Sequence, residues 1–370
     1  MFLHHLELTD YRNYQSLHLE LSHRKVVLLG DNAQGKTNIL EAIGLLATGK
    51  SATVSKDQDL VRWGAEHAII RARIHREVGE LGLDMMLRTR GRRACRLNGL
   101  AQKRLVDVLG KLLVVLFRAE DLMLVKGGPA ERREFIDTIL VQVSGAFHQY
   151  LQDYQRVMGQ RNHLLRAIQE GRGSQDVLEV YDEQFIPLAL AIWRRREALI
   201  SSLVPFVKAR HAAIAKDSEQ IELRYLPAWS LLGHQENDEE ALRQTIQQSR
   251  RQEISRGQTL NGPHRDDFEL LLDGRPAKFF GSQGQQRTVV LALKLAELDY
   301  IKEVTSEAPL LLLDDVLAEL DIRRQNALLE AMGEEVQTLV TTTHLSDFSA
   351  EWLHSAALFT VCKGQVQSRP

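Results

Sequence analysis

A glycine-rich segment of eight residues constrains the fold of this chain more than any other feature. The segment, GDNAQGKT, covers residues 30–37, follows the apolar run at residues 25–29 directly and leads into a helical pattern at residues 38–47. Its two glycines let the backbone curl so that its N–H groups and the positive end of the following helix face an anion. The order of strand, motif and helix predicts a phosphate-binding loop and therefore an α/β nucleotide-binding domain.

The residue types in this segment suit a nucleotide and its metal ion. Lys36 would reach the β- and γ-phosphates, and the Thr37 hydroxyl would ligate Mg²⁺. The alternative is a chance glycine turn with a surface lysine, which the coincidence of strand, motif and helix disfavours. We expect nucleotide contacts along the whole loop, from Gly30, Asp31, Asn32, Ala33, Gln34, Gly35, Lys36 and Thr37.

A buried strand that ends in two carboxylates comes much later in the chain. Residues 309–315 read PLLLLDD, which is typical of a strand covered on both faces. Asp314 would hold Mg²⁺ directly or through water, and Asp315, one residue further out, is placed where a base could polarise an attacking water. The alternative is a buried strand that ends in a solvated turn. Because most of the chain separates Thr37 from Asp314, the sequence predicts a split nucleotide-binding core.

Hydrophobic patterning changes twice along the chain. Residues 1–128 show short alternating or apolar runs, residues 129–256 show charged segments with apolar residues at helical spacing, and strands return in residues 257–370. We expect residues 1–128 and 257–370 to form two parts of one α/β lobe, with residues 129–256 as an inserted helical arm domain. At roughly 150 residues per domain, a length of 370 agrees with two or three units.

Charge and cysteine content bear on partners and compartment. The formal net charge is −2, so affinity for nucleic acid must come from local patches. The two cysteines, Cys95 and Cys362, lie far apart without a pairing rhythm, as is typical of a reducing compartment. The start of the sequence lacks a signal-peptide pattern, and no run approaches the ~18 consecutive apolar residues of a membrane span. We expect a cytoplasmic protein without a membrane partner.

A serine and a glycine introduce the helical stretch before the acidic strand. Ser282, Gly284 and Gln285 lead into a helix expected from about residue 286 to 304. A serine and a glycine at a helix start form an anion site, for which the chain offers no partner of its own. The alternative is a flexible loop that caps the helix. His344 ends the segment TTTH beyond the acidic strand, and the alternative to a functional role is a structural histidine of a turn.

A basic stretch lies between Met85 and Val106. It holds seven basic residues and no acidic one: Arg88, Arg90, Arg92, Arg93, Arg96, Lys103 and Arg104. Turn signals at Gly91 and at Asn98-Gly99 predict that a β-hairpin presents these arginines. The absence of interleaved aromatic residues favours binding of DNA phosphates without base stacking. The alternative is a solvated edge strand guarded by charge. Arginines of the arm are further candidates, although charged helix faces are usually only solvated: Arg132, Arg133, Arg161, Arg194, Arg195 and Arg196.

The motifs together resemble a known family. GDNAQGKT, FGSQGQQRT, LLLLDDVLAELD and TTTH are similar to the head of the ABC-type ATPases of the SMC kind. The segments at residues 117–137, 160–165 (QRNHLL) and 261–267 (NGPHRDD) resemble, in that order, the RecF family of bacterial recombination proteins. The resemblance spans most of the chain and implies an ABC/SMC-type P-loop ATPase head split by the helical arm.

This resemblance implies a function and a set of partners. The family implies a homodimer formed head to head around two ATP molecules, with weak DNA-stimulated hydrolysis. It implies binding to single-stranded DNA, gapped DNA and junctions of double and single strands, and work with RecO and RecR in loading RecA during recombinational repair, replication and the SOS response. By matching motif, Lys36, Asp315 and the switch histidine His344 serve catalysis, Asp314 serves Mg²⁺, and residues 282–285 face the partner's nucleotide through Ser282, Gly284 and Gln285.

The sequence departs from the general pattern at three positions. Gln283 replaces the glycine of the transporter signature, Asp315 replaces the usual glutamate, and Ala119 stands where proline is expected. The shorter Asp315 side chain leaves its role in activating water open. Residues 11–13 (YRN) resemble an element that approaches the nucleotide, and the alternative is that Arg12 lies at a solvated strand edge.

Two other classes share some of these motifs. A transporter ATPase subunit has the same head motifs, but the long inserted arm and the NGPHRDD segment disfavour it. An SMC-like scaffold would need an extended coiled coil, and the arm has no sustained heptads.

Overall fold

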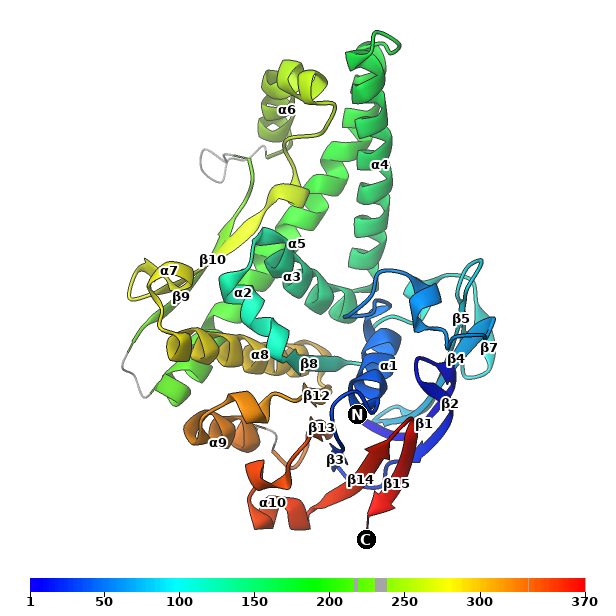
Figure 1. Ribbon diagram of the computed structural model, residues 1–370. Coiled ribbons are helices and arrows are strands. Elements are labelled where there is room, and N and C mark those ends of the chain that lie inside the picture. The colour runs from blue at the N-terminus through cyan, green and yellow to red at the C-terminus, as the bar shows by residue number, and fades with distance from the viewer. Residues whose placement is uncertain (216–218, 230–237, 332, 370) are drawn as a thin grey trace. The chain divides into compact units, whose positions relative to one another are not determined.

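The computed structural model describes residues 1–215, 219–229, 238–331 and 333–369 (Figure 1). The chain divides into two compact units. The head unit comprises Met1–Leu122, Phe206–Glu219 and Ser282–Pro370, and the arm unit comprises Met123–Pro205 and Gln220–Gly281.

A mostly parallel sheet carries the motifs of the head unit. Its order is β15-β14-β3-β13-β12-β8, in which β15 runs antiparallel to β14 and the other neighbours are parallel. The four leucines of β12 are buried, as a strand covered on both faces requires. The strands are β3 (Lys25–Leu29), β8 (Val114–Arg118), β12 (Leu310–Asp314), β13 (Thr338–Thr342), β14 (Ala356–Cys362) and β15 (Gln365–Arg369).

An antiparallel sheet forms the second layer of the head unit, in the order β2-β1-β4-β5-β6-β7. Its inward residues alternate with outward polar residues, for example in β4, so that one face enters the core and the other meets solvent. Helix α1 (Lys36–Thr48) contacts strands of both sheets, and one hydrophobic cluster joins all three layers. The strands are β1 (Phe2–Tyr11), β2 (Tyr14–Glu20), β4 (His67–Arg76), β5 (Gly79–Arg88), β6 (Ala94–Leu97) and β7 (Leu100–Gln102).

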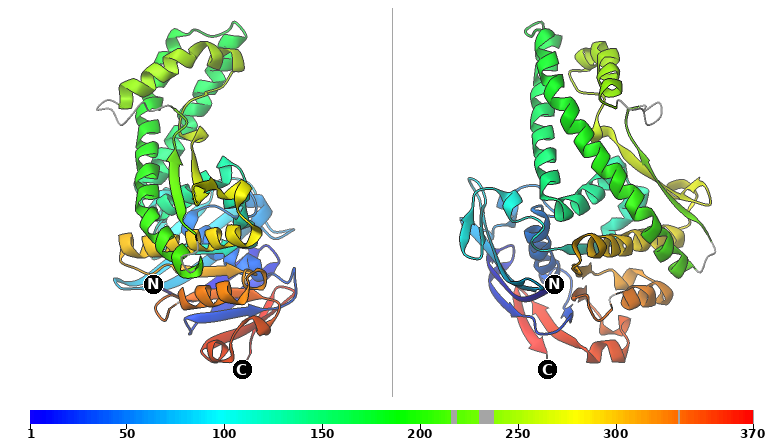
Figure 2. Two further views of the ribbon diagram at one scale, coloured as in Figure 1. Left: turned by 90° about the vertical axis from the view of Figure 1, so that its left-hand side faces the viewer. Right: turned by 180° about the vertical axis from the view of Figure 1, so that it is seen from behind.

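Helices cover the other face of the parallel sheet. Figures 1 and 2 show α8 (Gln283–Thr305) and α9 (Ile322–Ala331) on the side of β8, β12 and β13 away from α1. Helix α8 contacts β8 and α9, and the short α10 (Ala350–His354) contacts β14. The head is thus an α/β core whose parallel strands are covered on both faces. The predicted fold class is confirmed by the comparisons reported below.

The arm unit is mainly helical but contains a small sheet of order β11-β10-β9. Strand β9 (Ile221–Leu226) lies in a region where the sequence shows hardly any strand signal, and it pairs with β10 (Asp267–Leu272). The remaining elements are α2 (Met123–Lys126), α3 (Pro129–Val143), α4 (Gly145–Gln169), α5 (Asp176–Ala215), α6 (Asp238–Arg256), β11 (Arg275–Pro276) and α7 (Ala277–Phe280).

The two units do not end where the sequence suggests. The expected boundary at residue 257 lies inside the arm unit, because β10 pairs with β9 and keeps residues 257–281 there. The end of α5, from residue 206, belongs to the head unit, where Arg210 forms an ion pair with Asp299 of α8 at 2.6 Å. Helix α5 is also the one described helix long and apolar enough to cross a membrane, a test that core helices of soluble proteins pass as well.

A fully buried arginine joins three elements of the arm. The Arg161 guanidinium of α4 donates to Asp182 of α5 at 2.8 Å, to Glu253 of α6 at 2.6 Å and to the Thr259 hydroxyl at 2.8 Å. Its side chain is 0% exposed, and so is that of Glu253. Because all three partners accept hydrogen bonds from it, this charge is satisfied inside the protein.

The NGPHRDD segment is a second polar centre of the arm. Asp137 of α3 accepts two hydrogen bonds from Arg196 of α5, both at 2.8 Å, and Arg196 also donates to the Pro263 carbonyl at 2.6 Å. Asp266 accepts from the Tyr225 hydroxyl of β9. Arg161 and Arg196 are therefore interior ion-pair residues, and their burial excludes them as DNA contacts.

His264 of the same segment is held in its neutral form. The Tyr154 hydroxyl lies 2.6 Å from Nδ1, and Nε2 lies 3.1 Å from the Thr259 carbonyl oxygen. A neutral ring that accepts at Nδ1 and donates at Nε2 satisfies both contacts. Burial lowers the pKa of His264 to about 4. Nearby, Arg132 and Asp267 form an ion pair at 2.6 Å that removes Arg132 from the candidate DNA contacts.

Candidate functional site

The phosphate loop, residues 30–37, has the compact form that its sequence predicts. The Lys36 ammonium is buried and donates to the carbonyl oxygens of Gly30 at 2.7 Å and Asp31 at 3.1 Å. Gly35 caps helix α1 with a φ of 115°, a conformation that favours glycine. A Cβ at Gly30 would lie 2.3 Å from the Val361 carbonyl oxygen of β14. The two glycines are therefore required by geometry, and no side chain caps the start of α1 by a hydrogen bond.

Strand β12 brings the acidic motif against the phosphate loop. The Thr37 hydroxyl donates to Asp314 Oδ1 at 2.9 Å, across 277 residues of sequence. The Thr341 hydroxyl of β13 donates to the same oxygen at 2.8 Å. Burial raises the pKa of Asp314, and the neighbouring carboxylates of Asp315 and Glu120 add to this effect, while the two hydroxyls oppose it. A buried carboxylate beside another negative charge is a place where a cation would be stabilised.

Asp315 lies just beyond the end of β12. Its backbone has a φ of 51°, in the left-handed region, and its N–H donates to Thr341 Oγ1 at 2.9 Å. Aspartate is one of the few non-glycine residues that enter this region readily. The Thr341 hydroxyl lies 3.3 Å from Asp315 Oδ1 and 2.8 Å from Asp314 Oδ1, so both carboxylates meet the same residue of β13 at this edge of the sheet.

His344 reaches the same edge from β13. Asp314 pairs with Thr341 and Leu29 pairs with Thr342, so the carboxyl ends of β3, β12 and β13 are neighbours. His344 follows β13 by two residues, and its N–H donates to Thr342 Oγ1 at 3.1 Å. Its side chain is exposed. The structure therefore brings the phosphate loop, both aspartates and the histidine to one edge of the parallel sheet.

The start of helix α8 is a complete N-terminal cap. Ser282 Oγ accepts from the Gln285 N–H at 3.2 Å, and Gln285 Oε1 accepts from the Ser282 N–H at 2.6 Å. From α9, Arg324 donates to the Gly284 carbonyl at 2.6 Å and to Thr288 Oγ1 at 2.9 Å. The capping alternative drawn from the sequence is thus realised, and the Ser282 side chain remains exposed. Within the described residues, no hydrogen bond or ion pair links residues 282–285 to the phosphate loop.

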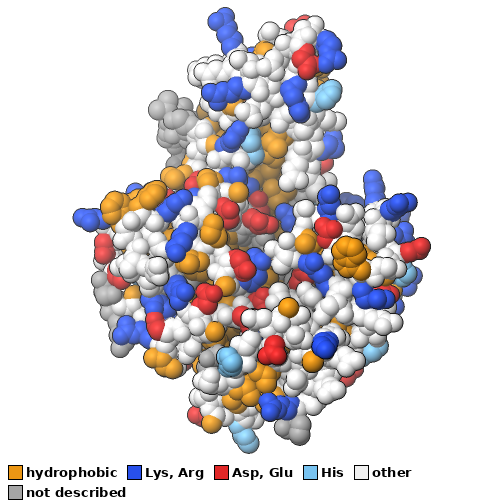
Figure 3. All heavy atoms as spheres, viewed as in Figure 1, with side chains coloured by type: hydrophobic (Ala, Val, Ile, Leu, Met, Phe, Trp, Pro, Cys, Tyr) orange, Lys and Arg blue, Asp and Glu red, His pale blue; other side chains and the backbone are white. Residues whose placement is uncertain are grey.

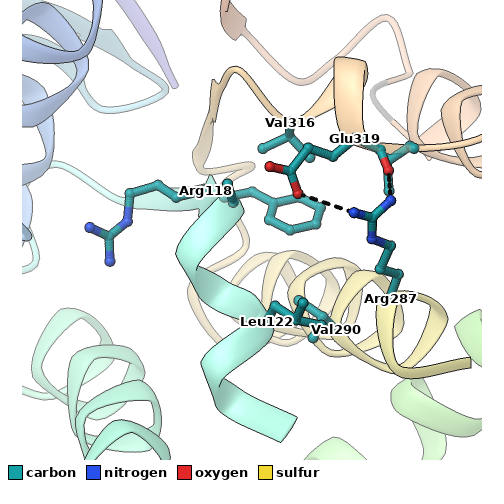
Figure 4. A pocket seen from close by; sticks show the side chains of 9 residues that line it. Arg118, Leu122, Arg287, Val290, Val316 and Glu319 are labelled. Atoms are coloured by element: carbon teal, nitrogen blue, oxygen red, sulfur yellow. Dashed lines mark hydrogen bonds and ion pairs between the residues drawn. The ribbon is translucent and has the colours of Figure 1, made fainter. Parts of the chain in front are cut away.

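A small, largely apolar pocket lies in the head beside the segment that follows β12. Figure 4 shows it between the end of β8, helix α8 and the turn that carries Val316 and Glu319. Arg287 and Glu319 face each other across its rim at 3.6 Å, whereas Arg118 points away and donates to the Ala52 carbonyl at 3.0 Å. No residue of the phosphate loop lines this pocket, so it is separate from the nucleotide-binding edge.

Residues 11–13 support the phosphate loop in a way that the sequence only partly indicates. Arg12 forms an ion pair with the buried Glu41 of α1 at 2.7 Å, which holds its guanidinium against that helix. Burial raises the pKa of Glu41, but hydrogen bonds from Arg12, Ser51 and Thr53 outweigh it and hold that pKa below its usual value. Asn13 Nδ2 donates to the Gln34 carbonyl of the loop at 2.9 Å. Glu41 is a supporting residue that no motif in the sequence analysis singles out.

The basic stretch forms the predicted hairpin. Strand β5 pairs with β6, and β6 pairs with β7 through a turn at Asn98-Gly99. Four of the five arginines proposed for DNA are exposed, and their side chains have no hydrogen-bond or ion-pair partner within the described part of the chain: Arg88, Arg90, Arg92 and Arg96. Arg93 differs, because it forms an ion pair with Asp57 at 2.5 Å and donates to the Gly49 carbonyl. Figure 3 shows Lys and Arg side chains gathered over the β5 and β7 region, toward the right of the view.

Fold and site together define an ATPase head of the ABC/SMC class. The family described as "RecF/RecN/SMC N terminal domain" matches residues 2–364. The "DNA replication and repair protein RecF" of Gloeobacter violaceus is 44% identical and covers 100% of this chain and 99% of the relative, and its namesake in an Exiguobacterium species is 43% identical over 100% and 99%.

Solved structures agree with the sequence relatives. The recombination mediator protein RecF-ATP in the RecFOR pathway superposes with a TM-score of 0.92 and 30% identity, covering 100% of this chain and 98% of that one. An Smc head bound to a winged-helix domain of ScpA has a TM-score of 0.56 at 17% identity, which shows a common fold. The chain belongs to the RecF family of DNA replication and repair proteins.

Proposed function

We propose that this protein is an ATP-dependent DNA-binding protein of recombinational repair and replication. It binds single-stranded DNA, gapped DNA and junctions of double and single strands, and it acts with RecO and RecR to load RecA. ATP closes two copies of the head into a dimer, and weak, DNA-stimulated hydrolysis reopens it. The observation that carries the proposal is the hydrogen bond between Thr37 and Asp314, which joins the two halves of the nucleotide motif.

The nucleotide is ATP, bound by the phosphate loop. Residues 30–37 supply backbone N–H groups, and Lys36 exchanges its two carbonyl partners for the β- and γ-phosphates. The Thr37 hydroxyl and the Asp314 carboxylate, 2.9 Å apart, are the hard oxygen ligands that suit Mg²⁺, so these two residues would hold the ion. The ion would neutralise charge on the phosphate oxygens. Asp315 orients the attacking water and His344 contacts the γ-phosphate.

The second copy of the chain completes the site. Ser282 and Gly284, at the exposed start of α8, face the γ-phosphate of the ATP that the other copy binds, with Gln285 holding the cap in place. A capped helix start without a phosphate partner on its own chain supports this arrangement. Dimerisation then depends on ATP because the nucleotide lies in the interface.

DNA binds along the hairpin of β5 and β6. Exposed arginines without internal partners are available for phosphate contacts, which supports Arg88, Arg90, Arg92 and Arg96 as the contact residues. Arg93 is omitted because Asp57 already neutralises it. Both cysteines, Cys95 and Cys362, are free thiols, which supports action in the reducing cytoplasm.

Sedimentation velocity tests the proposal directly. The purified protein is measured with ATP, with ADP and without nucleotide, each with and without a gapped DNA. We expect dimers whenever ATP is present, with or without DNA, and we expect the dimer to bind DNA more tightly than the monomer does. Ser282→Arg should bind ATP and stay monomeric, because the long arginine side chain at the exposed cap would occupy the space that the facing copy and its nucleotide need. Val304→Arg, at the other end of α8 and 51% exposed, is the control with the same added charge. A monomer indifferent to ATP would refute the dimer, and an unchanged affinity of Lys36→Ala for ATP would refute the nucleotide site.

A further inference from the structure

One tryptophan of the head unit is almost fully exposed. The Trp63 side chain is 96% exposed, whereas Trp193, Trp229 and Trp352 are 2%, 1% and 7% exposed. An indole is among the most apolar side chains, and leaving it in water forgoes the stabilisation that burial would give. Packing of the head does not explain this residue.

The backbone that carries Trp63 is firmly tied to the head. The Arg62 N–H donates to the Asp10 carbonyl at 2.8 Å, and the Arg62 guanidinium forms an ion pair with the Asp10 carboxylate at 2.7 Å. On the other side, the Ala65 N–H donates to the Arg62 carbonyl at 3.0 Å, and Gly64 has a φ of 87°. Trp63 is therefore the tip of a closed turn, held out by contacts at both sides, so that little order would be lost when a ligand covers the ring.

The same turn adjoins the arginine-bearing loop between β5 and β6. The Thr89 N–H donates to the Glu66 carbonyl at 3.1 Å, and His67 pairs with Arg88 in the sheet. At the start of the segment, the Asp57 carboxylate accepts from Arg93. The loop of residues 89–93 is thus tied to the Trp63 segment on both sides of the tryptophan. Sheet pairing thus brings the segment that carries Trp63 to the loop that carries Arg90 and Arg92.

The surroundings of Trp63 favour a nucleic acid over an apolar protein surface. The other large hydrophobic side chains exposed on this sheet are Val78, in the turn before β5, and Leu100, at the start of β7, and both lie at the ends of β5 and β6 opposite to this loop. Protein interfaces usually surround a tryptophan with further apolar contacts. A lone ring with unpaired arginines nearby matches a ligand that combines flat bases with phosphates.

We propose that Trp63 stacks on an unpaired base of DNA whose phosphates bind Arg88, Arg90 and Arg92. This inference rests on the proposed DNA-binding function and adds to it a preference for single strands and junctions, because only an unpaired base offers a free face. The ring supplies affinity that is insensitive to salt, and the arginines supply the salt-sensitive part. Base stacking without hydrogen bonds to base edges is tolerant of sequence.

Tryptophan fluorescence gives the test. Because the other three tryptophans are buried, the exposed, acrylamide-quenchable emission comes from Trp63. We expect single-stranded DNA to quench this emission and shield it from acrylamide, and we expect a closed duplex without ends to have little effect. Trp63→Ala should bind single-stranded DNA roughly 5- to 100-fold more weakly, while Trp63→Phe retains most of the affinity. Val78→Ala, at the distant turn, is the control and should bind normally.

Salt dependence separates the two parts of the interface. Trp63→Ala should keep the slope of log affinity against log salt, whereas the double variant Arg90→Glu, Arg92→Glu should reduce it by roughly 0.7 for each phosphate that the protein no longer neutralises. If DNA binds normally while Trp63 emission and the Trp63→Ala affinity stay unchanged, stacking is refuted and the DNA-binding function stands. If a higher protein concentration, and not DNA, protects Trp63 emission from acrylamide, the ring belongs to a protein interface and the proposal is overturned. If no DNA binds at all, the proposed function itself fails.

Discussion

Replacing Arg161 by methionine tests whether the buried charges of the arm depend on one guanidinium. The substitution keeps an unbranched stem of similar length and removes the donors to Asp182, Glu253 and Thr259. Breaking a buried ion pair costs about 3–5 kcal/mol, because the remaining charge is left uncompensated. Asp182 keeps a second ion pair, to Arg250, so Glu253 carries most of the penalty. We therefore expect a loss near the lower limit, about 3 kcal/mol at pH 8.

Urea unfolding, followed by tryptophan fluorescence, measures this loss, since Trp193 and Trp229 are buried in the arm unit. Adding Glu253→Gln to Arg161→Met should restore part of the stability, because it removes the stranded charge. Arg166→Met, an exposed position on the same helix, is the control, with an expected change within about 0.5 kcal/mol. The reasoning would be refuted if Arg161→Met were as stable as Arg166→Met, or if adding Glu253→Gln to Arg161→Met lowered the stability further.

Three further predictions concern single residues of the arm and head. His264 takes up a proton below about pH 6.5 in the unfolded chain but only below about pH 4 in the folded arm. The free energy of unfolding should therefore fall by up to about 3 kcal/mol as the pH is lowered from 6.5 to 4. Urea unfolding of His264→Gln should lack that part of the pH dependence. Gly30→Ala should abolish ATP binding in a fluorescent-nucleotide titration, because its Cβ would meet the Val361 carbonyl oxygen at 2.3 Å; Gly44→Ala, whose nearest neighbour is 3.9 Å away, should bind normally. Asp315→Asn should form ATP-dependent dimers in sedimentation yet release no phosphate, and turnover equal to that of the unchanged protein would remove Asp315 from the hydrolytic step.

The sequence predicts the phosphate loop and the acidic strand well because their chemistry depends on local order. A strand, a glycine turn, a lysine and a helix occupy consecutive positions, so the loop is recognisable before any tertiary contact is known. The run of four leucines likewise predicts a buried strand, and β12 is one. Strand β9 is missed because its alternating residues give a short, weak pattern that only pairing with β10 stabilises. That pairing also explains why the arm extends past residue 257.

Other features depend on contacts that a linear pattern does not contain. Arg93 resembles its neighbours in the sequence, yet a partner 36 residues away, Asp57, removes it from the DNA-binding candidates. Arg161 reads as part of a charged helix face but is fully buried, because its partners come from α5, α6 and the loop after α6. The sequence analysis infers DNA binding without aromatic residues, whereas the sheet register ties the segment that carries Trp63 to the basic loop. Charge and aromatic patterns therefore predict a DNA-binding surface only after the strand order is known.

The central position of β3 in the parallel sheet has a consequence for synthesis. Its two neighbours are β13, which begins at Thr338, and β14, which begins at Ala356, whereas β3 itself ends at Leu29. At roughly 5–20 residues per second, a ribosome leaves the phosphate loop without its sheet partners for tens of seconds, while the arm can already fold on its local contacts. During that interval the backbone N–H and C=O groups along both edges of β3 are without their sheet partners. Nucleotide binding therefore requires that β13 and β14 have been made, and a chain cut short before β13 would bind no ATP.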